Sequence, residues 1–403
     1  MSYQTEIQSY TSNQHAESTG SFNNAHHFNI EQATFNAGGT INHTNNNYHL
    51  NDEEEKKEIS KWLAAPDCFT NLTTALDKRV IGTSQWILED SAYKKWMEKA
   101  GIWWIQGKAG SGKTFLITYI IKNLKDTTSA SSVVYHYFDT CDTTGSKTSY
   151  KGMLSFLMLQ LGAQDDKIHP ALKKLFQSSK DGLSYLEPTN IQLLDTLKEI
   201  IRDLFQQKHQ VYIIIDALDE CKESHLVLDF IREMTHFSWL RIIISSRTHP
   251  PEALACFQTV LSDHNLIKKD IDIFVNNQMR LKFKDPSLEI KVRNKLLEKA
   301  DGGFRYIDCQ LQVINKCAIS RKVETALAKL PSNLRDTYTN VLASYNSEDD
   351  LEYIYHLVIW LLYSFEPVHL KQVATLFSID LKAQTVESNT ELLAGIETIV
   401  VAL

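Results

Sequence analysis

The residues best suited to chemistry form one glycine-rich run, whose residue types and spacing indicate phosphate binding. The run Gly107-Lys108-Ala109-Gly110-Ser111-Gly112-Lys113-Thr114 fits the pattern G-x-x-x-x-G-K-[ST] in full. Glycines let backbone N–H groups turn inward around phosphate oxygens, and a helix that follows points its positive end at the same anion. We expect Lys113 to reach the β- and γ-phosphates of a nucleotide and the Thr114 hydroxyl to ligate Mg²⁺. The predicted nucleotide-binding residues are Gly107, Gly110, Ser111, Gly112, Lys113 and Thr114.

A second candidate is the acidic end of the apolar run at residues 211–215, in the sequence VYIIIDALDE. The apolar residues predict a central strand that ends at Asp216, and ligands of open parallel sheets bind beyond the carboxyl ends of the strands. We therefore expect Asp216 to hold Mg²⁺, directly or through water. Glu220 is the candidate for polarising an attacking water, with Asp219 as its rival. The alternative for both is an ordinary role as loop acids.

Arg247 is the third candidate, because it directly follows the predicted strand at residues 241–245 and Ser246. A guanidinium fixed at this edge of the sheet can sense a γ-phosphate and stabilise charge that develops during its transfer. The alternative is a surface arginine that pairs with an acid.

Alternating strands and helices must position these residues. Short apolar runs predict strands at residues 102–106, 133–138, 211–215 and 241–245, and amphipathic stretches predict helices at 115–124, 152–161 and 191–206. Continuous apolar strands that alternate with helices are typical of a parallel sheet buried on both faces. The predicted fold class is α/β, with a P-loop NTPase sheet flanked by helices at residues 101–262.

Helical periodicity predominates on either side of this predicted domain. A charged run opens a helical lead-in at residues 51–100. Helices are predicted at residues 271–279, 292–300, 306–316 and 351–363. We expect a helical domain at residues 263–345 and a winged-helix-like domain at 346–403.

Residues 1–50 differ in kind, because they contain no Lys or Arg and are rich in Asn, His, Ser and Thr. One interpretation is a disordered, low-complexity leader. The other is a conditionally ordered β segment at residues 22–43, since Asn-rich stretches with aromatics and little charge suit stacked cross-β pairing. The histidines of this segment have no metal-ligand spacing.

The composition excludes several classes of protein. The formal net charge of −7 and the lack of a long Lys/Arg cluster argue against nucleic acid as a partner. Six cysteines lie scattered without a C-x-x-C pair, which favours free thiols in a reducing compartment, and no secretory signal is visible. The most apolar stretch, at residues 353–365, is too short for a stable membrane span. A cytoplasmic protein is expected.

With the P-loop, IIIDALDE and IISSR in that order, the chain resembles the NACHT group of signal-transduction ATPases. The resemblance is to fungal members of the Nod-like receptor class with a nephrocystin-like nucleotide-binding domain. Flanking motifs also match, among them Gly82-Thr83 and Trp86 before the P-loop, Gly302-Gly303-Phe304-Arg305-Tyr306 and Leu330-Pro331 after it, and Phe365-Glu366-Pro367-Val368.

The resemblance implies a molecular switch with ATP or ADP and Mg²⁺ as cofactors. A closed, ADP-bound monomer would exchange to ATP and assemble into a homo-oligomer, which would bring N-terminal segments to a downstream effector. Lys113, Thr114, Asp216, Glu220 and Arg247 would keep the roles given above. The family's winged helix also presents a histidine to ADP, but neither His356 nor His369 matches that motif.

The predicted function is therefore a slow, regulatory ATPase switch in fungal innate-immunity-like or incompatibility signalling. One alternative is a scaffold with a structural nucleotide site, assembled by β-templating through the Asn-rich N-terminus; a less favoured one is a metabolic P-loop kinase. GTP is not excluded, because the P-loop contacts phosphate and not the base. Family members usually continue into C-terminal repeats, so this chain is either a truncated form or senses by another route.

Overall fold

A computed structural model gives the fold of this chain. It describes residues 46–128, 131–163, 167–181, 184–261, 265–279, 286–300, 303–343, 354–360, 379–380 and 385–386. The β-segment hypothesis for residues 22–43 falls outside these ranges, as does most of the winged-helix-like domain predicted for residues 346–403. His369 and Pro367 also lie outside the described residues.

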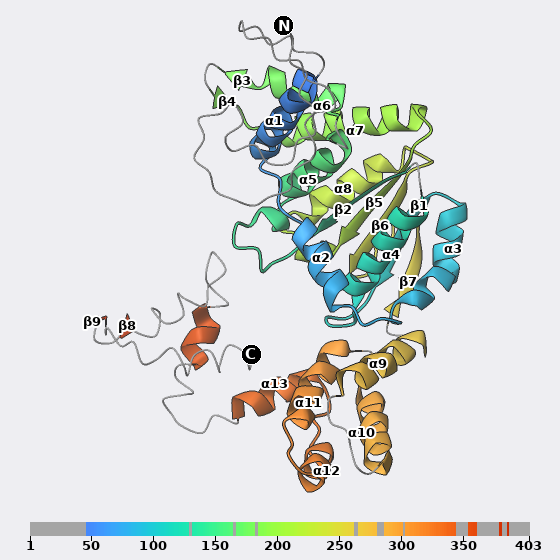
Figure 1. Cartoon of the computed structure of the whole chain (residues 1–403), viewed down its shortest axis with the longest axis vertical. Coiled ribbons are helices and arrows are strands. Elements are labelled where there is room, and N and C mark those ends of the chain that lie inside the picture. Colours follow the sequence, from blue (N-terminus) through green and yellow to red (C-terminus); the bar gives the residue numbers. More distant parts are fainter. Residues whose placement is uncertain are drawn as a thin grey trace, which may run out of the picture. The chain divides into compact units, whose positions relative to one another are not determined.

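Five parallel strands form the central sheet, in the order β2-β5-β6-β1-β7 (Figure 1). They are β1 (Gly101–Gln106), β2 (Ser131–Tyr137), β5 (Gln210–Asp216), β6 (Arg241–Ser246) and β7 (Cys256–Val260). The apolar runs predict the first four, and the parallel α/β arrangement is confirmed. They do not predict β7, because only Thr259 of that edge strand is buried.

Alternate side chains of the strands enter two hydrophobic cores, as the period of two in a strand requires. Trp104 and Ile213 pack with helices on one face of the sheet, whereas the adjacent Trp103 and Ile214 pack with helices on the other. The first group is α5 (Tyr150–Gly162), α6 (Pro170–Ser178), α7 (Asn190–Gln206) and α8 (Ser224–Met234). The second includes α3 (Ser91–Glu98) and α4 (Lys113–Thr127). The sheet is therefore covered on both faces.

Helices also precede β1. They include α1 (Asn46–Leu63), α2 (Phe69–Lys78), the 3₁₀ turn η1 (Gln85–Glu89) and α3. Ile59, Trp62 and Leu63 of α1 are buried, and the indole Nε1–H of Trp62 donates to the carbonyl oxygen of Leu186 at 2.7 Å.

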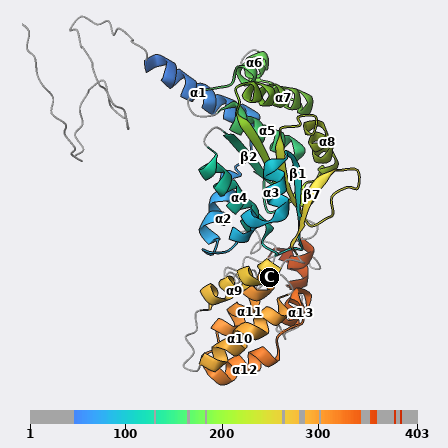
Figure 2. The same ribbon diagram turned by 90° about the vertical axis from the view of Figure 1, so that its right-hand side faces the viewer.

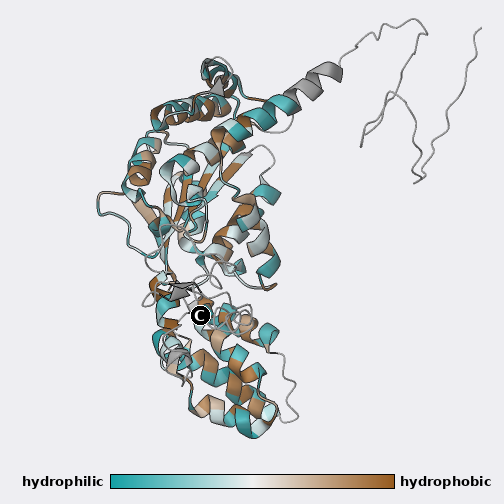
Figure 3. Cartoon of the chain, turned by 90° about the vertical axis from the view of Figure 1, so that its left-hand side faces the viewer, coloured by the Kyte–Doolittle hydropathy of each residue, from teal (hydrophilic) through white to brown (hydrophobic). Residues whose placement is uncertain are grey.

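Helices follow the sheet in the described residues beyond β7. They include α9 (Asn265–Gln278), α10 (Pro286–Lys299), α11 (Phe304–Asn315), α12 (Ser320–Ala328) and α13 (Leu334–Ala343), which pack against one another (Figure 2). Both apolar and polar residues occur along them (Figure 3). Apolar residues such as Ile271, Leu296 and Ile307 belong to the same core as Trp103 of β1. The two-residue strands β8 (Ile379–Asp380) and β9 (Thr385–Val386) form a separate pair.

One side chain of α5 covers part of the free edge of β2. The Gln160 Nε2–H donates to the carbonyl oxygen of Tyr135 at 2.8 Å, and its Oε1 accepts the Tyr135 N–H at 3.2 Å. An amide that donates and accepts in this way satisfies the backbone groups that an added strand would otherwise pair.

No helix among the described residues is long and apolar enough to cross a membrane.

Candidate functional site

The glycine-rich run forms a loop between β1 and α4. Its first residue is tied to the sheet, because the Gly107 N–H donates to the carbonyl oxygen of Ser246 at 3.2 Å. Gly110 and Gly112 have φ angles of +73° and +85°, a left-handed conformation that glycine adopts without steric cost. α4 begins at Lys113 directly after the loop. The structure therefore has the strand, loop and helix arrangement that binds phosphate.

Lys113 lies folded over this loop. Its Nζ donates to the carbonyl oxygens of Gly107 and Lys108, at 2.7 and 2.9 Å. Burial lowers the pKa of the Lys113 ammonium, and the charge of Asp216 opposes that shift. The loop carbonyls thus hold the cation at the place where a phosphate would need it.

Thr114 and Asp216 come together across the sheet. The Thr114 hydroxyl donates to Oδ2 of Asp216 at 2.8 Å, and the Ser245 hydroxyl donates to Oδ1. Asp216 is buried, and burial raises its pKa, whereas the bonds from Ser245 and Thr114 oppose that rise. A hydroxyl and a carboxylate in contact beside a P-loop are the oxygen ligands that Mg²⁺ takes, with its remaining ligands from phosphate and water. The donor set therefore fits a nucleotide-bound Mg²⁺.

The end of β5 makes a strained turn after Asp216. Ala217 has φ +54° and ψ +49°, and its N–H donates to the Ser245 hydroxyl oxygen at 2.9 Å. A left-handed alanine costs on the order of 1–2 kcal/mol, so the surrounding contacts must hold it. This turn brings Asp219 and Glu220 back to the edge of the sheet beside Arg247.

Arg247 pairs with both candidate catalytic acids. Its Nε lies 3.0 Å from Oδ2 of Asp219, and its Nη2 lies 2.8 Å from Oε1 of Glu220. The Arg247 N–H also donates to Oδ1 of Asp219 at 2.9 Å. The sequence left open whether Arg247 serves phosphate or pairs with an acid, and in this structure it pairs with acids.

Thr140 is a residue of this site that the sequence did not indicate. It lies in the loop after β2, and its N–H and hydroxyl donate to Oε2 of Glu220 at 3.1 and 3.3 Å. Both carboxylate oxygens of Glu220 are therefore engaged, one by Arg247 and the other by Thr140. A lone threonine in a polar loop carries no sequence signal for this contact.

Lys113, Thr114, Asp219, Glu220 and Arg247 line one cavity of about 860 Å³. Ligand pockets typically measure roughly 300–1,000 Å³, so the cavity has room for a nucleotide. Its walls include the P-loop, the acids and Arg247, and they also include segments that the sequence did not assign to the site. These segments are residues 77–81 and 83–84, part of α9 with Asp270 and Phe274, and the start of α11 with Phe304 and Arg305. Their only signal was the family resemblance of Gly82-Thr83 and Phe304-Arg305.

Asp270 joins α9 to the segment before the P-loop. Its Oδ2 accepts the Ser84 N–H at 2.7 Å and the Trp86 indole N–H at 2.9 Å. Burial raises the pKa of this carboxyl, and the two hydrogen bonds oppose the rise. These hydrogen bonds join two walls of the large cavity, α9 and the segment that contains Ser84.

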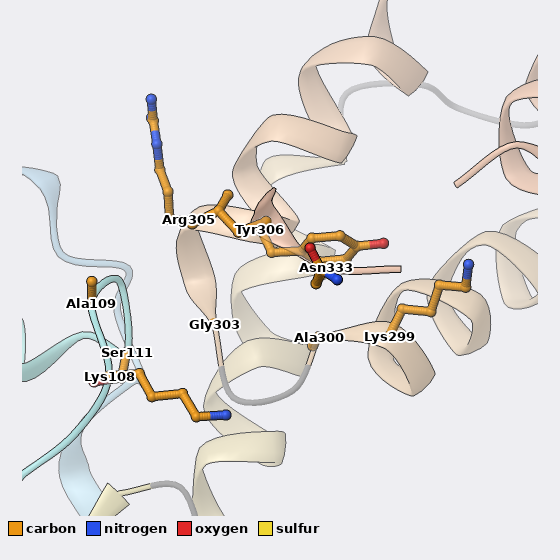
Figure 4. A pocket seen from close by; sticks show the side chains of 10 residues that line it. Lys108, Ala109, Ser111, Lys299, Ala300, Gly303, Arg305, Tyr306 and Asn333 are labelled. Carbon is orange, nitrogen blue, oxygen red and sulfur yellow. The ribbon is translucent and has the colours of Figure 1, made fainter. Parts of the chain in front are cut away.

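A second, smaller cavity of about 100 Å³ lies between the P-loop and the residues around Gly303. Figure 4 shows that the cationic side chains lining it, Lys108, Lys299 and Arg305, extend in different directions. The Lys299 Nζ donates to the carbonyl oxygen of Leu330 at 2.7 Å, and Arg305 Nη1 donates to Asp308 at 3.3 Å. This cavity is too small for a nucleotide, and its cations do not converge on one point.

A parallel sheet with a P-loop after β1 and a buried acid at the tip of β5 defines a P-loop nucleoside-triphosphatase domain. Residues 82–247 match the family model described as Nephrocystin 3, N-terminal. These residues are a P-loop domain of the nephrocystin 3, NACHT-like type, which confirms the resemblance seen in the sequence. The matched range contains all the predicted site residues, from Gly107 to Arg247.

The chain is also distantly similar to the vegetative incompatibility protein HET-E-1 of Podospora anserina. The two are 24% identical over an alignment of 311 residues, and the match covers 72% of this chain. The chain spans about a fifth of that relative, 22% of its length.

Two solved structures show a coarse likeness. One is the Aeropyrum pernix ORC1 protein in complex with DNA, with 11% identity, 84% of each chain covered and a TM-score of 0.36. The other is Drosophila ORC bound to DNA, with 16% identity, 86% of this chain and 88% of that chain covered, and a TM-score of 0.30.

Proposed function

We propose that this protein binds ATP and ADP with Mg²⁺, hydrolyses ATP slowly and works as a conformational switch. The observation that carries the nucleotide site is the contact of the Thr114 hydroxyl with Asp216 at 2.8 Å beside the P-loop. In P-loop domains a hydroxyl and an acid of this kind hold Mg²⁺, and Thr114 and Asp216 would hold it here. The Mg²⁺ would supply positive charge that offsets the charge of the phosphates.

The P-loop residues would hold the phosphates. Gly107, Gly110, Ser111 and Gly112 would shape the loop, and its N–H groups with the N-terminus of α4 would surround the anion. Lys113 would exchange its bonds to the Gly107 and Lys108 carbonyls for bonds to phosphate oxygens. An ammonium that already lies in the loop needs only a short movement to make this exchange.

The acids and Arg247 would perform the hydrolytic step. Glu220 would accept a hydrogen bond from the attacking water, with Asp219 as the rival for this role. In the present geometry both oxygens of Glu220 already accept hydrogen bonds, Oε1 from Arg247 and Oε2 from Thr140. Arg247 would turn to the γ-phosphate, and Glu220 would become available as it does so. This coupling favours slow, conditional hydrolysis.

The extent of the cavity supports the switch. A ligand in it would contact the P-loop domain on one side and α9 and α11 on the other. A nucleotide can shift a closed-to-open equilibrium only through contacts that differ between the two states, and a cavity with walls from both parts allows such contacts. The similarity to a vegetative incompatibility protein supports a role in fungal incompatibility-like signalling.

Further elements of the proposal come from the family resemblance. They are assembly of ATP-bound copies into a homo-oligomer, contact of the N-terminal leader with a downstream effector, and a winged-helix-like domain at residues 346–403. The boundaries at 101–262 and 263–345 belong to the same proposal.

The test is to purify the protein without added nucleotide, denature it and identify what is released. We expect near-stoichiometric ADP from the wild type. Lys113→Ala should reduce it at least about ten-fold, since a hydrogen bond from a charged group contributes roughly 1.5–3 kcal/mol. Lys108→Ala is the matched control, because the motif leaves this neighbouring position variable. A wild type that releases no nucleotide and turns over ATP rapidly would overturn the switch and indicate a conventional ATPase or kinase.

A further inference from the structure

The first residue of α11 is hydrogen-bonded to the backbone of the P-loop. The Phe304 N–H donates to the carbonyl oxygen of Gly110 at 2.9 Å. The Phe304 ring is anchored in turn by Phe274 of α9, with ring centroids 5.5 Å apart in an edge-to-face arrangement. A helix of the region beyond the sheet thus holds a peptide group of the phosphate-binding loop.

The glycines of the loop are what let α11 come this close. A Cβ at Gly110 would lie 2.8 Å from Cβ of Arg305, and one at Gly112 would lie 3.2 Å from Cε2 of Phe304. The first distance is shorter than any ordinary carbon–carbon contact, and the second is tight. Gly110 and Gly112 are therefore required twice, once for their positive φ angles and once as the surface on which α11 rests.

The bond to Gly110 reaches Lys113 through the loop itself. In a planar trans peptide the carbonyl oxygen and the following N–H point in opposite directions, so fixing the Gly110 oxygen also fixes the Ser111 N–H. That N–H donates to the carbonyl oxygen of Lys108 at 3.3 Å, and the same oxygen accepts from Lys113 Nζ at 2.9 Å. A continuous series of hydrogen bonds leads from Phe304 to the ammonium that would bind phosphate.

We propose that Phe304 is a positioning residue for the P-loop, through which the helices beyond the sheet control how tightly the loop holds nucleotide. The proposal rests on the proposed nucleotide site and adds its regulation. With Phe304 in place, the Gly110–Ser111 peptide keeps the orientation seen here, and bound nucleotide is retained. When α11 moves away, that peptide is free to rotate, and nucleotide leaves faster.

The geometry of the helix start allows the hydrogen bond to be removed separately from the ring. Phe304 is the first residue of α11, and proline is favoured at that position because its missing N–H has no partner within the helix. The preceding Gly303 has φ −103° and ψ +105°, an extended conformation that suits a residue before proline. Phe304→Pro removes the ring and the N–H, whereas Phe304→Ala removes the ring alone.

The control is Ser320→Pro, at the first position of α12 and after the extended Ile319. The experiment measures the dissociation rate of a fluorescent ADP analogue with Mg²⁺, and hydrogen–deuterium exchange at the Ser111 amide without nucleotide. We expect Phe304→Pro to release ADP about five-fold faster than Phe304→Ala, the change for one hydrogen bond. Ser111 should also exchange faster in Phe304→Pro, and Ser320→Pro should match the wild type in both measurements.

Each outcome decides between the two proposals. If all variants bind ADP and release it at the wild-type rate, with unchanged exchange at Ser111, the role of Phe304 is overturned and the nucleotide site stands. If the wild type binds no nucleotide but Phe304→Pro speeds exchange at Ser111, the coupling stands and the proposed function fails. Equal effects of Phe304→Pro and Ser320→Pro would show a general loosening of the helices and would overturn the proposal.

Discussion

Nη2 of Arg247 lies 2.8 Å from Oε1 of Glu220, so the cation proposed to serve the γ-phosphate is bound to the carboxylate proposed to polarise water. Nε of Arg247 also pairs with Asp219, so the two acids together hold the guanidinium at this edge of the sheet. In the proposed function, a phosphate that draws Arg247 away would release Oε1 of Glu220 from this pair. An ion pair at the surface normally contributes little to stability. The Arg247 side chain is half exposed in this pair, so we expect loss of the pair to change function more than stability.

The first prediction separates Glu220 from Asp219. Glu220→Gln should lower the single-turnover rate of ATP hydrolysis by at least about 100-fold, the scale of general-base assistance, with ATP affinity retained. Asp219→Asn should have a smaller effect on this rate. The Asp219 carboxylate mainly holds Arg247, since it pairs with Nε of Arg247 and accepts the Arg247 backbone N–H. Hydrolysis lost in Asp219→Asn and kept in Glu220→Gln would reverse the two roles.

The second prediction concerns the hydroxyl of Thr114. Thr114→Val removes the donor to Asp216 and the proposed Mg²⁺ ligand, whereas Thr114→Ser keeps both. Mg²⁺ raises ATP affinity by some factor in the wild type, and we expect that factor to be at least about ten-fold smaller in Thr114→Val, the equivalent of ~1.4 kcal/mol. Affinity measured in EDTA should not change. A gain from Mg²⁺ in Thr114→Val equal to that of the wild type would show that the hydroxyl is not a ligand.

The third prediction tests the bond between α9 and the segment before the P-loop. Asp270→Ala leaves the Ser84 N–H and the Trp86 indole N–H without their buried acceptor. We expect the free energy of unfolding by urea to fall by about 2–6 kcal/mol, at roughly 1–3 kcal/mol for each of the two donors. Asp270→Asn should recover part of this loss, because its amide oxygen can accept both bonds.

Asp272→Ala is the control for Asp270→Ala. Asp272 lies on the same helix but pairs with Arg293, and it is more exposed than Asp270. Its replacement should cost no more than about 1 kcal/mol, as for a surface ion pair. Equal losses for the two alanine variants would mean that the Asp270 contacts have no special importance.

The fourth prediction is a pH dependence that comes from His136. This side chain is fully buried, its Nε2 lies 3.2 Å from the carbonyl oxygen of Lys147, and its Nδ1 lies 3.6 Å from Sγ of Cys68. Burial lowers the pKa of His136 to about 4, below the value of ~6.5 for an unfolded histidine. Between these two pKa values the unfolded chain binds a proton that the folded chain does not. The stability contributed by neutral His136 is therefore complete above about pH 6.5 and is lost as the pH falls toward 4.

The measurement is the free energy of unfolding by urea between pH 4.5 and 8. His136→Gln should remove a slope of up to about 1.4 kcal/mol per pH unit below pH 6.5. The exposed His236 provides the control, and His236→Gln should keep the wild-type slope. An unchanged slope in His136→Gln would show that His136 titrates alike in the folded and unfolded chains.

The sheet and the P-loop could be predicted from the sequence because local patterns determine them. Continuous apolar runs mark four of the five strands, and the fixed spacing of glycines with Lys113 marks the loop. β7 was not predicted, because an edge strand in which only Thr259 is buried has no continuous apolar run.

The rest of the site depends on contacts between residues far apart in the chain. Thr140 reaches Glu220 across 80 positions, and Asp270 reaches Ser84 across 186. No local periodicity encodes such a meeting, since each residue is an ordinary polar one in its own segment. The same holds for Phe304, whose neighbours Gly302-Gly303 indicate a turn but not the loop on which it packs.

The amide of Gln160 occupies the place beside Tyr135 that the backbone of an incoming strand would take. An uncovered strand edge can pair with another extended chain, so the Gln160 side chain hinders such pairing at Tyr135. If copies of this protein join through β structure, the β2 edge is a poor place for them to begin. A strand that joined β2 at Tyr135 would first have to displace both hydrogen bonds of the Gln160 amide.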